Sequence, residues 1–250
     1  MAMSGHFDLK RYIIHNISFV SYTSACYLLL SPVSVQELLI WWADKGAAAG
    51  YRSQELSAED AARAQALRSP KAQLDWRVSR ALLQEIRQAM PPATLSLSHS
   101  GGHAVCASAP AGWQLGADLE RVRPREVLRL AEWVCAPAEQ ATLAGLEGAA
   151  QLERFYLLWT LKEAFIKAAG LDFPADMASV GLDFGGKAEW RLRAPPGQWR
   201  ACSWRLGEDW IASVAWLGQA GGATRPQWRA GTDCVLPPLA ILGAWASGPD

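Results

Sequence analysis

The chain has 250 residues and a mass of 27.2 kDa, and 50% of its residues are hydrophobic, which is enough to bury a core in one large domain or two small lobes. Its 24 Lys and Arg residues balance its 24 Asp and Glu residues, so the formal net charge is zero. No overall electric field attracts nucleic acid or an anionic membrane, and we expect neither as a partner. Chemistry on phosphate groups must therefore depend on local charge.

The cysteines and the N-terminal region indicate a cytoplasmic protein. The five cysteines are widely spaced and form no C-x-x-C pair, which disfavours a disulfide framework and a zinc site. Residues 1–24 lack a signal-peptide pattern and are predicted to be a leader of uncertain order. Residues 25–42 are too polar for a membrane span, and we predict a strand at 27–30 followed by a short helix.

Two helices and a β-meander are predicted next. Ser57 begins a capping box that opens a helix through about residue 67, and apolar residues at helical spacing predict a helix over 70–90. Strands with intervening turns follow at 94–99, 103–109 and 113–120. In such a meander the first and third strands run in the same direction. This would bring His99, Asp118 and Glu120 to one edge of the sheet.

The order helix, helix, strands then occurs a second time. Helices are predicted at 124–134, 137–146 and 151–169, with Gly170 as a left-handed cap, and strands at 179–184, 188–192, 199–206 and 210–217. We therefore predict an α+β fold with a pseudo-twofold arrangement of two similar α/β lobes and the active site between them. The lobes are assigned to residues 25–120 and 121–217, followed by a C-terminal tail at 218–250 that wraps the surface or frays.

Acidic residues in two of these elements suit a metal site. On a strand, Gly116, Asp118 and Glu120 share one face, and on a helix, Glu163 and Lys167 project the same way. Three carboxylates suit Mg²⁺ or Mn²⁺. Alternatively, the strand acids are a solvated end neutralised by nearby arginines, and the helix pair is an ordinary surface ion pair. The apolar neighbours of Glu163 favour a functional role, since buried charges need partners.

His99 stands next to Ser98 and before a Ser-Gly-Gly turn that could present hydroxyls and backbone N–H groups to a phosphate. A structural histidine is the alternative. Arginines between residues 121 and 129 could face an acidic partner or form a solvated helix start. The sequence contains no phosphate-binding loop, no nucleophile elbow and no H-E-x-x-H, so the common NTPase, serine hydrolase and zinc protease classes lack their motifs.

Three ordered motifs resemble a known family. S-L-S-H-S, G-A-D-L-E and W-T-L-K-E-A-F-I-K, in this order and spacing, resemble the motifs of the larger, monomeric, surfactin-type 4′-phosphopantetheinyl transferases, over roughly residues 50–217. The resemblance implies an enzyme that moves the 4′-phosphopantetheine arm of coenzyme A to a serine of an acyl or peptidyl carrier protein, with release of 3′,5′-ADP.

The resemblance also implies roles for single residues. Asp118, Glu120 and Glu163 match the Mg²⁺ ligands, and Glu163, Lys167 and Glu139 are the predicted catalytic residues, with Glu163, Glu139 or a metal-bound water as the base. The predicted coenzyme A contacts are Ser98, His99, Arg80, Lys162 and Lys167. Arg80 is chosen because Gln84 stands where the family commonly has a basic residue; Arg63 and Arg68 are alternatives.

Two other functions use the same residues. A metal-dependent phosphohydrolase could employ the same acids without loading a protein. A non-catalytic carrier-binding module would need only the basic surface.

Overall fold

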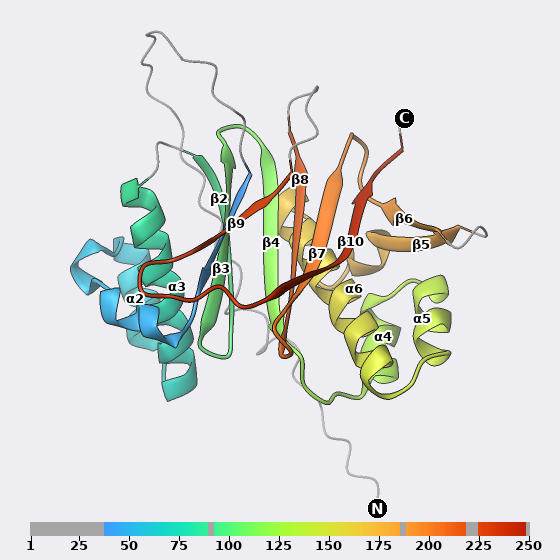
Figure 1. The fold of residues 1–250 in the computed structure, drawn as a ribbon, viewed down its shortest axis with the longest axis horizontal. Coiled ribbons are helices and arrows are strands. Elements are labelled where there is room, and N and C mark those ends of the chain that lie inside the picture. The colour runs from blue at the N-terminus through green and yellow to red at the C-terminus, as the bar shows by residue number, and fades with distance from the viewer. Residues whose placement is uncertain (1–37, 90–92, 186–188, 219–224, 249–250) are drawn as a thin grey trace, which may run out of the picture.

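The computed structural model describes residues 38–89, 93–185, 189–218 and 225–248, and these form two four-stranded sheets, one two-stranded sheet and five α-helices (Figure 1). Sheet A has the order β2 (Ala93–Ser100), β3 (His103–Pro110), β1 (Leu39–Ala43), β9 (Gln227–Ala230). Sheet B has the order β10 (Leu239–Ala246), β7 (Arg200–Leu206), β8 (Trp210–Leu217), β4 (Gln114–Arg121). The small sheet pairs β5 (Gly181–Gly185) with β6 (Glu189–Arg193).

The helices are α2 (Ala58–Ala66), α3 (Pro70–Ala89), α4 (Val127–Val134), α5 (Pro137–Ala144) and α6 (Gly148–Ala169), and short 3-10 turns lie at Lys45–Gly50, Ser53–Glu55 and Met177–Ser179. Local signals set their ends as predicted: the Ser57 hydroxyl accepts the Asp60 N–H at 3.1 Å, and Gly170 is left-handed with φ of 64°. Across the described ranges, we find no helix whose length and apolar character would let it span a bilayer.

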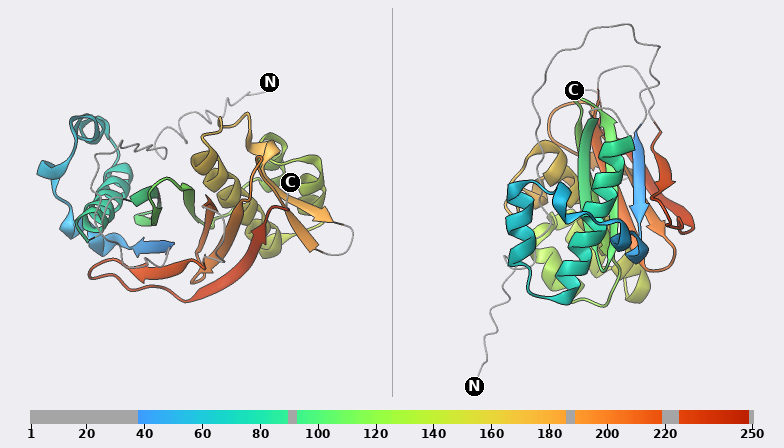
Figure 2. Two further views of the ribbon diagram at one scale, coloured as in Figure 1. Left: turned by 90° about the horizontal axis from the view of Figure 1, so that it is seen from above. Right: turned by 90° about the vertical axis from the view of Figure 1, so that its left-hand side faces the viewer.

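The predicted α+β arrangement of two similar lobes is confirmed. Helix α3 packs on sheet A through Val78, Leu82 and Ile86, and α6 packs on sheet B through a larger cluster that includes Leu158, Phe165 and Ile211. In Figure 2 (left), α3 and α6 lie on the same side of the two sheets, one over each. The lobe boundary itself remains a prediction.

Strand β1 lies where a short helix was predicted. Residues 39–43 pair with β3 on one edge and with β9 on the other, and four of the five are buried. A central strand that is covered on both faces loses the alternation of polar and apolar residues, which is why the pattern resembled a buried helix. The strand predicted at 27–30 lies outside the described residues.

The predicted meander is wrong in one respect, because the third strand leaves the sheet. Both edges of β3 are occupied, by β2 and β1, and β4 instead joins sheet B beside β8. The hydroxyls of Ser96, Ser98 and Ser100 accept the backbone N–H groups of Ala117, Leu119 and Arg121 at 2.9, 3.2 and 3.4 Å. These contacts advance in the same direction along both strands, so β2 and β4 run parallel, as expected. Serine side chains thus join the two sheets.

The faces of the sheets that point away from the helices share a third core. Leu38, Ile40 and Val105 of the first lobe pack with Leu115, Leu119 and Val214 of the second, together with five buried tryptophans: Trp42, Trp113, Trp204, Trp210 and Trp216. Burial of this apolar surface holds the lobes together.

The C-terminal tail adds one edge strand to each sheet. Strand β9 pairs with β1, and β10 pairs with β7, on the side of the sheets away from α3 and α6 (Figure 2). Of the two expectations for the tail, the structure shows that it wraps the surface. Trp228 of β9 packs edge-on against Trp204 of β7, with ring centroids 5.3 Å apart. The N–H and hydroxyl of Thr232 both donate to the Glu85 carboxylate of α3. The tail therefore ties the lobes together.

Helix α6 crosses β4 in backbone contact at Gly116. A Cβ atom at this position would lie 1.9 Å from the Ala164 carbonyl oxygen and 2.7 Å from the Ala168 nitrogen. Only glycine allows this approach, and it directs the strand face shared by Gly116, Asp118 and Glu120 toward the helix.

We predict that Gly116→Ala lowers the free energy of unfolding by about 3 kcal/mol or more, because the added methyl group must push two backbones apart. Thermal and urea unfolding measure the effect. Gly145→Ala is the control, since a Cβ there meets its nearest atom at 3.6 Å. Equal stability of the two variants would contradict the packing described.

Candidate active site

Three buried carboxylates and one ammonium meet where β4 and α6 cross. Asp118, Glu120 and Glu163 are 1%, 6% and 6% exposed, and Lys167 is 9% exposed. The Lys167 ammonium contacts Asp118 Oδ1 at 2.8 Å and the Ala117 carbonyl oxygen at 3.1 Å. The structure thus brings together the predicted metal-binding carboxylates and Lys167, a predicted coenzyme A contact.

The acids disturb each other's ionisation. Burial and, to a smaller extent, the nearby charge of Asp118 raise the pKa of Glu120 to about 7 and that of Glu163 to about 8, while Lys167 opposes the rise. Such displaced pKa values at a cluster of acids are typical of functional sites. Three ionised carboxylates would carry more negative charge than Lys167 can offset, so without a cation the two glutamates tend to keep their protons.

The chemistry of this cluster fits a hard divalent cation. Asp118 Oδ2 is buried and has no hydrogen-bond partner, and oxygen ligands with uncompensated charge are those that Mg²⁺ prefers. As they stand, however, no three His, Cys, Asp or Glu side chains within the described ranges are placed to hold a metal ion. The metal assignment therefore remains a proposal.

His99 lies among charged side chains of both lobes. Burial, with smaller effects of Arg80, Lys167 and Lys71, lowers the pKa of its imidazole to about 4, while Asp75 opposes this. At neutral pH the ring is therefore uncharged and offers one N–H donor. The structure places His99 near Lys167, as a shared phosphate site requires.

Arg80 is buried on α3 and already engaged. Its guanidinium lies 4.0 Å from the Trp76 ring centroid and contacts Asp60 at 3.1 Å. Its charge nevertheless acts on His99. The predicted coenzyme A contact remains a prediction.

Ser98 and the following turn differ from the expectation. The Ser98 hydroxyl is fully buried, where it accepts the Leu119 N–H and donates to Asp118 Oδ1 at 2.8 Å. Both roles of the hydroxyl are thus used inside the protein, which corrects its predicted contact with coenzyme A. The Gly102 N–H, which was expected to face a phosphate, donates to Asp75 of α3 instead.

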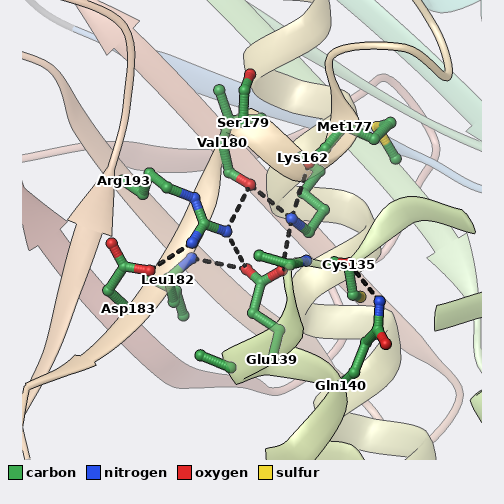
Figure 3. Close-up of polar contacts among 12 residues, drawn as sticks. Cys135, Glu139, Gln140, Lys162, Met177, Ser179, Val180, Leu182, Asp183 and Arg193 are labelled. Carbon is green, nitrogen blue, oxygen red and sulfur yellow. Dashed lines mark hydrogen bonds and ion pairs between the residues drawn. The ribbon is translucent and has the colours of Figure 1, made fainter. Parts of the chain in front are cut away.

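Glu139 and Lys162 belong to a separate buried network (Figure 3). Both side chains are 0% exposed, and their charged atoms are 2.8 Å apart. Lys162 also donates to the carbonyls of Met177 and Val180, and Glu139 also accepts from Arg193 and from the Leu182 N–H. The network connects α5, α6, β5 and β6.

This placement corrects the predictions for Glu139 as a base and Lys162 as a coenzyme A contact. Successive residues on a helix point about 100° apart, so Lys162 faces α5 while Glu163 faces β4. The Glu139 carboxylate is enclosed by the two cations and by the N–H groups of Ala136 and Leu182, so it has no position for an incoming substrate proton. We assign both residues to the stability of the second lobe.

Several residues of these networks were not identified from the sequence. Ser100 donates to Glu120 at 3.0 Å, Asp75 holds the turn beside His99, and Arg193 pairs with Glu139. The alternation of serines in S-L-S-H-S was a usable signal for Ser100. Arg193 carried no such signal, because it lies 54 positions from Glu139 in the chain.

We predict that Glu139→Gln lowers the free energy of unfolding by about 3 kcal/mol or more, because it leaves Lys162 with a neutral partner inside the protein. Urea unfolding measures the loss. Glu153→Gln is the matched control: its pair with Arg205 is exposed and should contribute less than about 1 kcal/mol. Unchanged stability of Glu139→Gln together with lost catalysis would restore Glu139 as a base.

The raised pKa values predict a pH dependence of stability. Between pH 6.5 and 8, unfolded Glu163 is ionised while the folded side chain still holds its proton, so stability falls as pH rises toward 8. His99 contributes the opposite slope only below about pH 6.5, its ordinary pKa. Glu163→Gln should flatten the slope in chelator-treated protein. Identical slopes for both proteins, measured by urea unfolding, would count against the raised pKa.

The part of the chain that carries this cluster matches a known family. Residues 114–215 match the model of the 4′-phosphopantetheinyl transferase superfamily. The chain is 31% identical over 134 residues to a putative 4′-phosphopantetheinyl transferase of Synechocystis, covering 45% of this chain and 54% of that protein. It is 35% identical over 107 residues to the 4′-phosphopantetheinyl transferase Sfp of Bacillus subtilis, covering 41% and 46%.

A further relative and one solved structure complete the comparison. The 4′-phosphopantetheinyl transferase AcpT of Escherichia coli is 32% identical over 112 residues, covering 38% of this chain and 57% of that protein. A holo-(acyl-carrier-protein) synthase of Bacillus anthracis, in complex with CoA (3′,5′-ADP), aligns with a TM-score of 0.37 and 16% identity over 43% of this chain and 96% of that one.

The chain spans about half the length of the curated relatives it matches. The matched region includes the whole of β4 and α6 and most of β8, which form the acidic cluster and its support. The region that matches the model of the 4′-phosphopantetheinyl transferase superfamily thus also contains Asp118, Glu120, Glu163 and Lys167.

Proposed function

We propose that this protein transfers the 4′-phosphopantetheine arm of coenzyme A to a serine hydroxyl of an acyl or peptidyl carrier protein and releases 3′,5′-ADP. The observation that carries the proposal is the buried cluster of Asp118, Glu120, Glu163 and Lys167, which lies within the region that matches the superfamily. The three carboxylates would all be ionised only beside a cation, and a diphosphate substrate needs both a cation and an ammonium.

Mg²⁺ would be held by Asp118, Glu120 and Glu163, and when bound it supplies positive charge that offsets the charge developing on the diphosphate. The burial and mutual repulsion of these acids, together with the orphan oxygen Asp118 Oδ2, support this assignment. Lys167, held by Asp118, supplies a fixed positive charge for the phosphates.

In the transfer step, the serine oxygen of the carrier forms a bond to the β-phosphorus of coenzyme A. The bond between that phosphorus and the bridging oxygen breaks, and 3′,5′-ADP leaves with the electron pair. Glu163 would take the proton of the serine hydroxyl through a carboxylate oxygen that the cation leaves free. Glu139, enclosed in its own network, takes no part.

Neighbouring surfaces supply the remaining contacts. His99 would donate its single N–H to a coenzyme A phosphate, between Lys167 and the cations of α3. Exposed Arg129 lies on α4 and the half-buried Arg125 lies just before it, and their charge would suit the acidic helix of a carrier. We further propose a monomer that acts in the cytoplasm, in keeping with its scattered cysteines.

We predict that Asp118→Asn reduces carrier loading by about 100-fold or more, because it removes a charge that both the cation and Lys167 need. Apo carrier proteins of several types are incubated with coenzyme A and Mg²⁺ and weighed by mass spectrometry. Asp209→Asn is the matched control, since Asp209 is an exposed partner of Arg121.

The same assay separates the alternatives. Release of free phosphopantetheine without loading would indicate a phosphohydrolase. Carrier binding without any mass gain from the unaltered protein would indicate a binding module. Full activity of Asp118→Asn would contradict the assigned site.

A further inference from the structure

The serines that join the two sheets are not equivalent. Ser96, Ser98 and Ser100 alternate along β2, and each hydroxyl oxygen accepts a backbone N–H of β4. In an ordinary sheet, backbone carbonyls would accept these N–H groups. Here side chains do so, and the sheets remain two separate hydrogen-bonded units.

A hydroxyl that accepts an N–H still has its own proton to donate. Ser98 donates it to Asp118 Oδ1 at 2.8 Å, and Ser100 donates it to Glu120 Oε2 at 3.0 Å. Because serines and acids both recur every two residues, each hydroxyl meets the carboxylate one position before the N–H that it accepts. Ser96 occupies the same register opposite Gly116, which has no side chain.

The two contacts determine which carboxylate oxygens are occupied. Asp118 Oδ1 receives both Ser98 and Lys167, and Oδ2 is left as the oxygen without a partner. Neutral donors stabilise the carboxylates without cancelling their charge, so the acids keep their attraction for a cation. Hydrogen bonds from outside a metal's own ligands commonly orient those ligands in this way.

We propose that Ser98 and Ser100 are positioning residues, which fix Asp118 and Glu120 for a divalent cation while they join the lobes; this rests on the proposed function for the identity of the reaction. Ser96 has only the joining role. Strand β2 thus contains two serines that orient an acid and join the sheets, and one serine that only joins the sheets.

The test compares Ser98→Ala, Ser100→Ala and Ser96→Ala in the full chain. Binding of Mn²⁺, a spectroscopic substitute for Mg²⁺, is measured by electron paramagnetic resonance without coenzyme A, and unfolding is measured in chelator. We expect the Mn²⁺ Kd to rise about 10-fold or more in Ser98→Ala and Ser100→Ala, and by less than about twofold in Ser96→Ala. Ser100→Thr, which keeps the hydroxyl, should restore binding.

Equal Mn²⁺ affinity for the three alanine variants, or no restoration by Ser100→Thr, would overturn the proposal. So would a failure of the unaltered protein to bind Mn²⁺. If Ser98→Ala does not fold, the Mn²⁺ affinities of Ser100→Ala and Ser100→Thr decide whether the proposal holds, because Ser100 is only half-buried. Carrier loading is measured in parallel. If the unaltered protein binds Mn²⁺ but loads no carrier, the proposed function is refuted. The comparison of Mn²⁺ Kd values still decides the role of the serines in that case.

Discussion

The contact between the backbones of α6 and β4 at Gly116 is the constraint on which the site depends. It places the turn of α6 from Ala164 to Ala168 close enough to the strand for the Lys167 ammonium to reach Asp118 at 2.8 Å. The same approach excludes water from Glu120 and Glu163, which raises their pKa values. A methyl group at position 116 would separate these elements. One residue without a side chain thus determines both the geometry and the electrostatics of the acidic cluster.

Helix α6 carries two buried lysines, and their surroundings distinguish stability from chemistry. Lys162 has a carboxylate, two carbonyl oxygens and a neighbouring guanidinium around it, so its charge is compensated and held in place. Lys167 instead faces three carboxylates, one of which has an orphan oxygen. A compensated buried pair is costly to break and has no capacity for a ligand. An uncompensated cluster attracts one, which is why the second lysine marks the site.

The two lobes are held together in three ways, each of which bears on the site. Serine hydroxyls join β2 to β4, apolar residues of both sheets share one core, and the C-terminal strands tie sheet A to sheet B. Because the core and the C-terminal strands lie away from α3 and α6, they maintain the joint without covering the acids. The serine joint is the part that touches the carboxylates, so the lobe interface and the candidate site are one structure.

Local order in the chain determined much of this protein. The cap at Ser57, the left-handed Gly170 and the alternation of Gly116, Asp118 and Glu120 depend only on neighbouring residues, and they were predicted. So was the shared face of Glu163 and Lys167. Only the tertiary structure decided that β1 is a strand, that β4 leaves the meander and that Ser98 points inward to Asp118. It also decided that Glu139 pairs with Lys162 and Arg193, because burial and pairing between distant segments depend on which surfaces meet, and no local pattern records this.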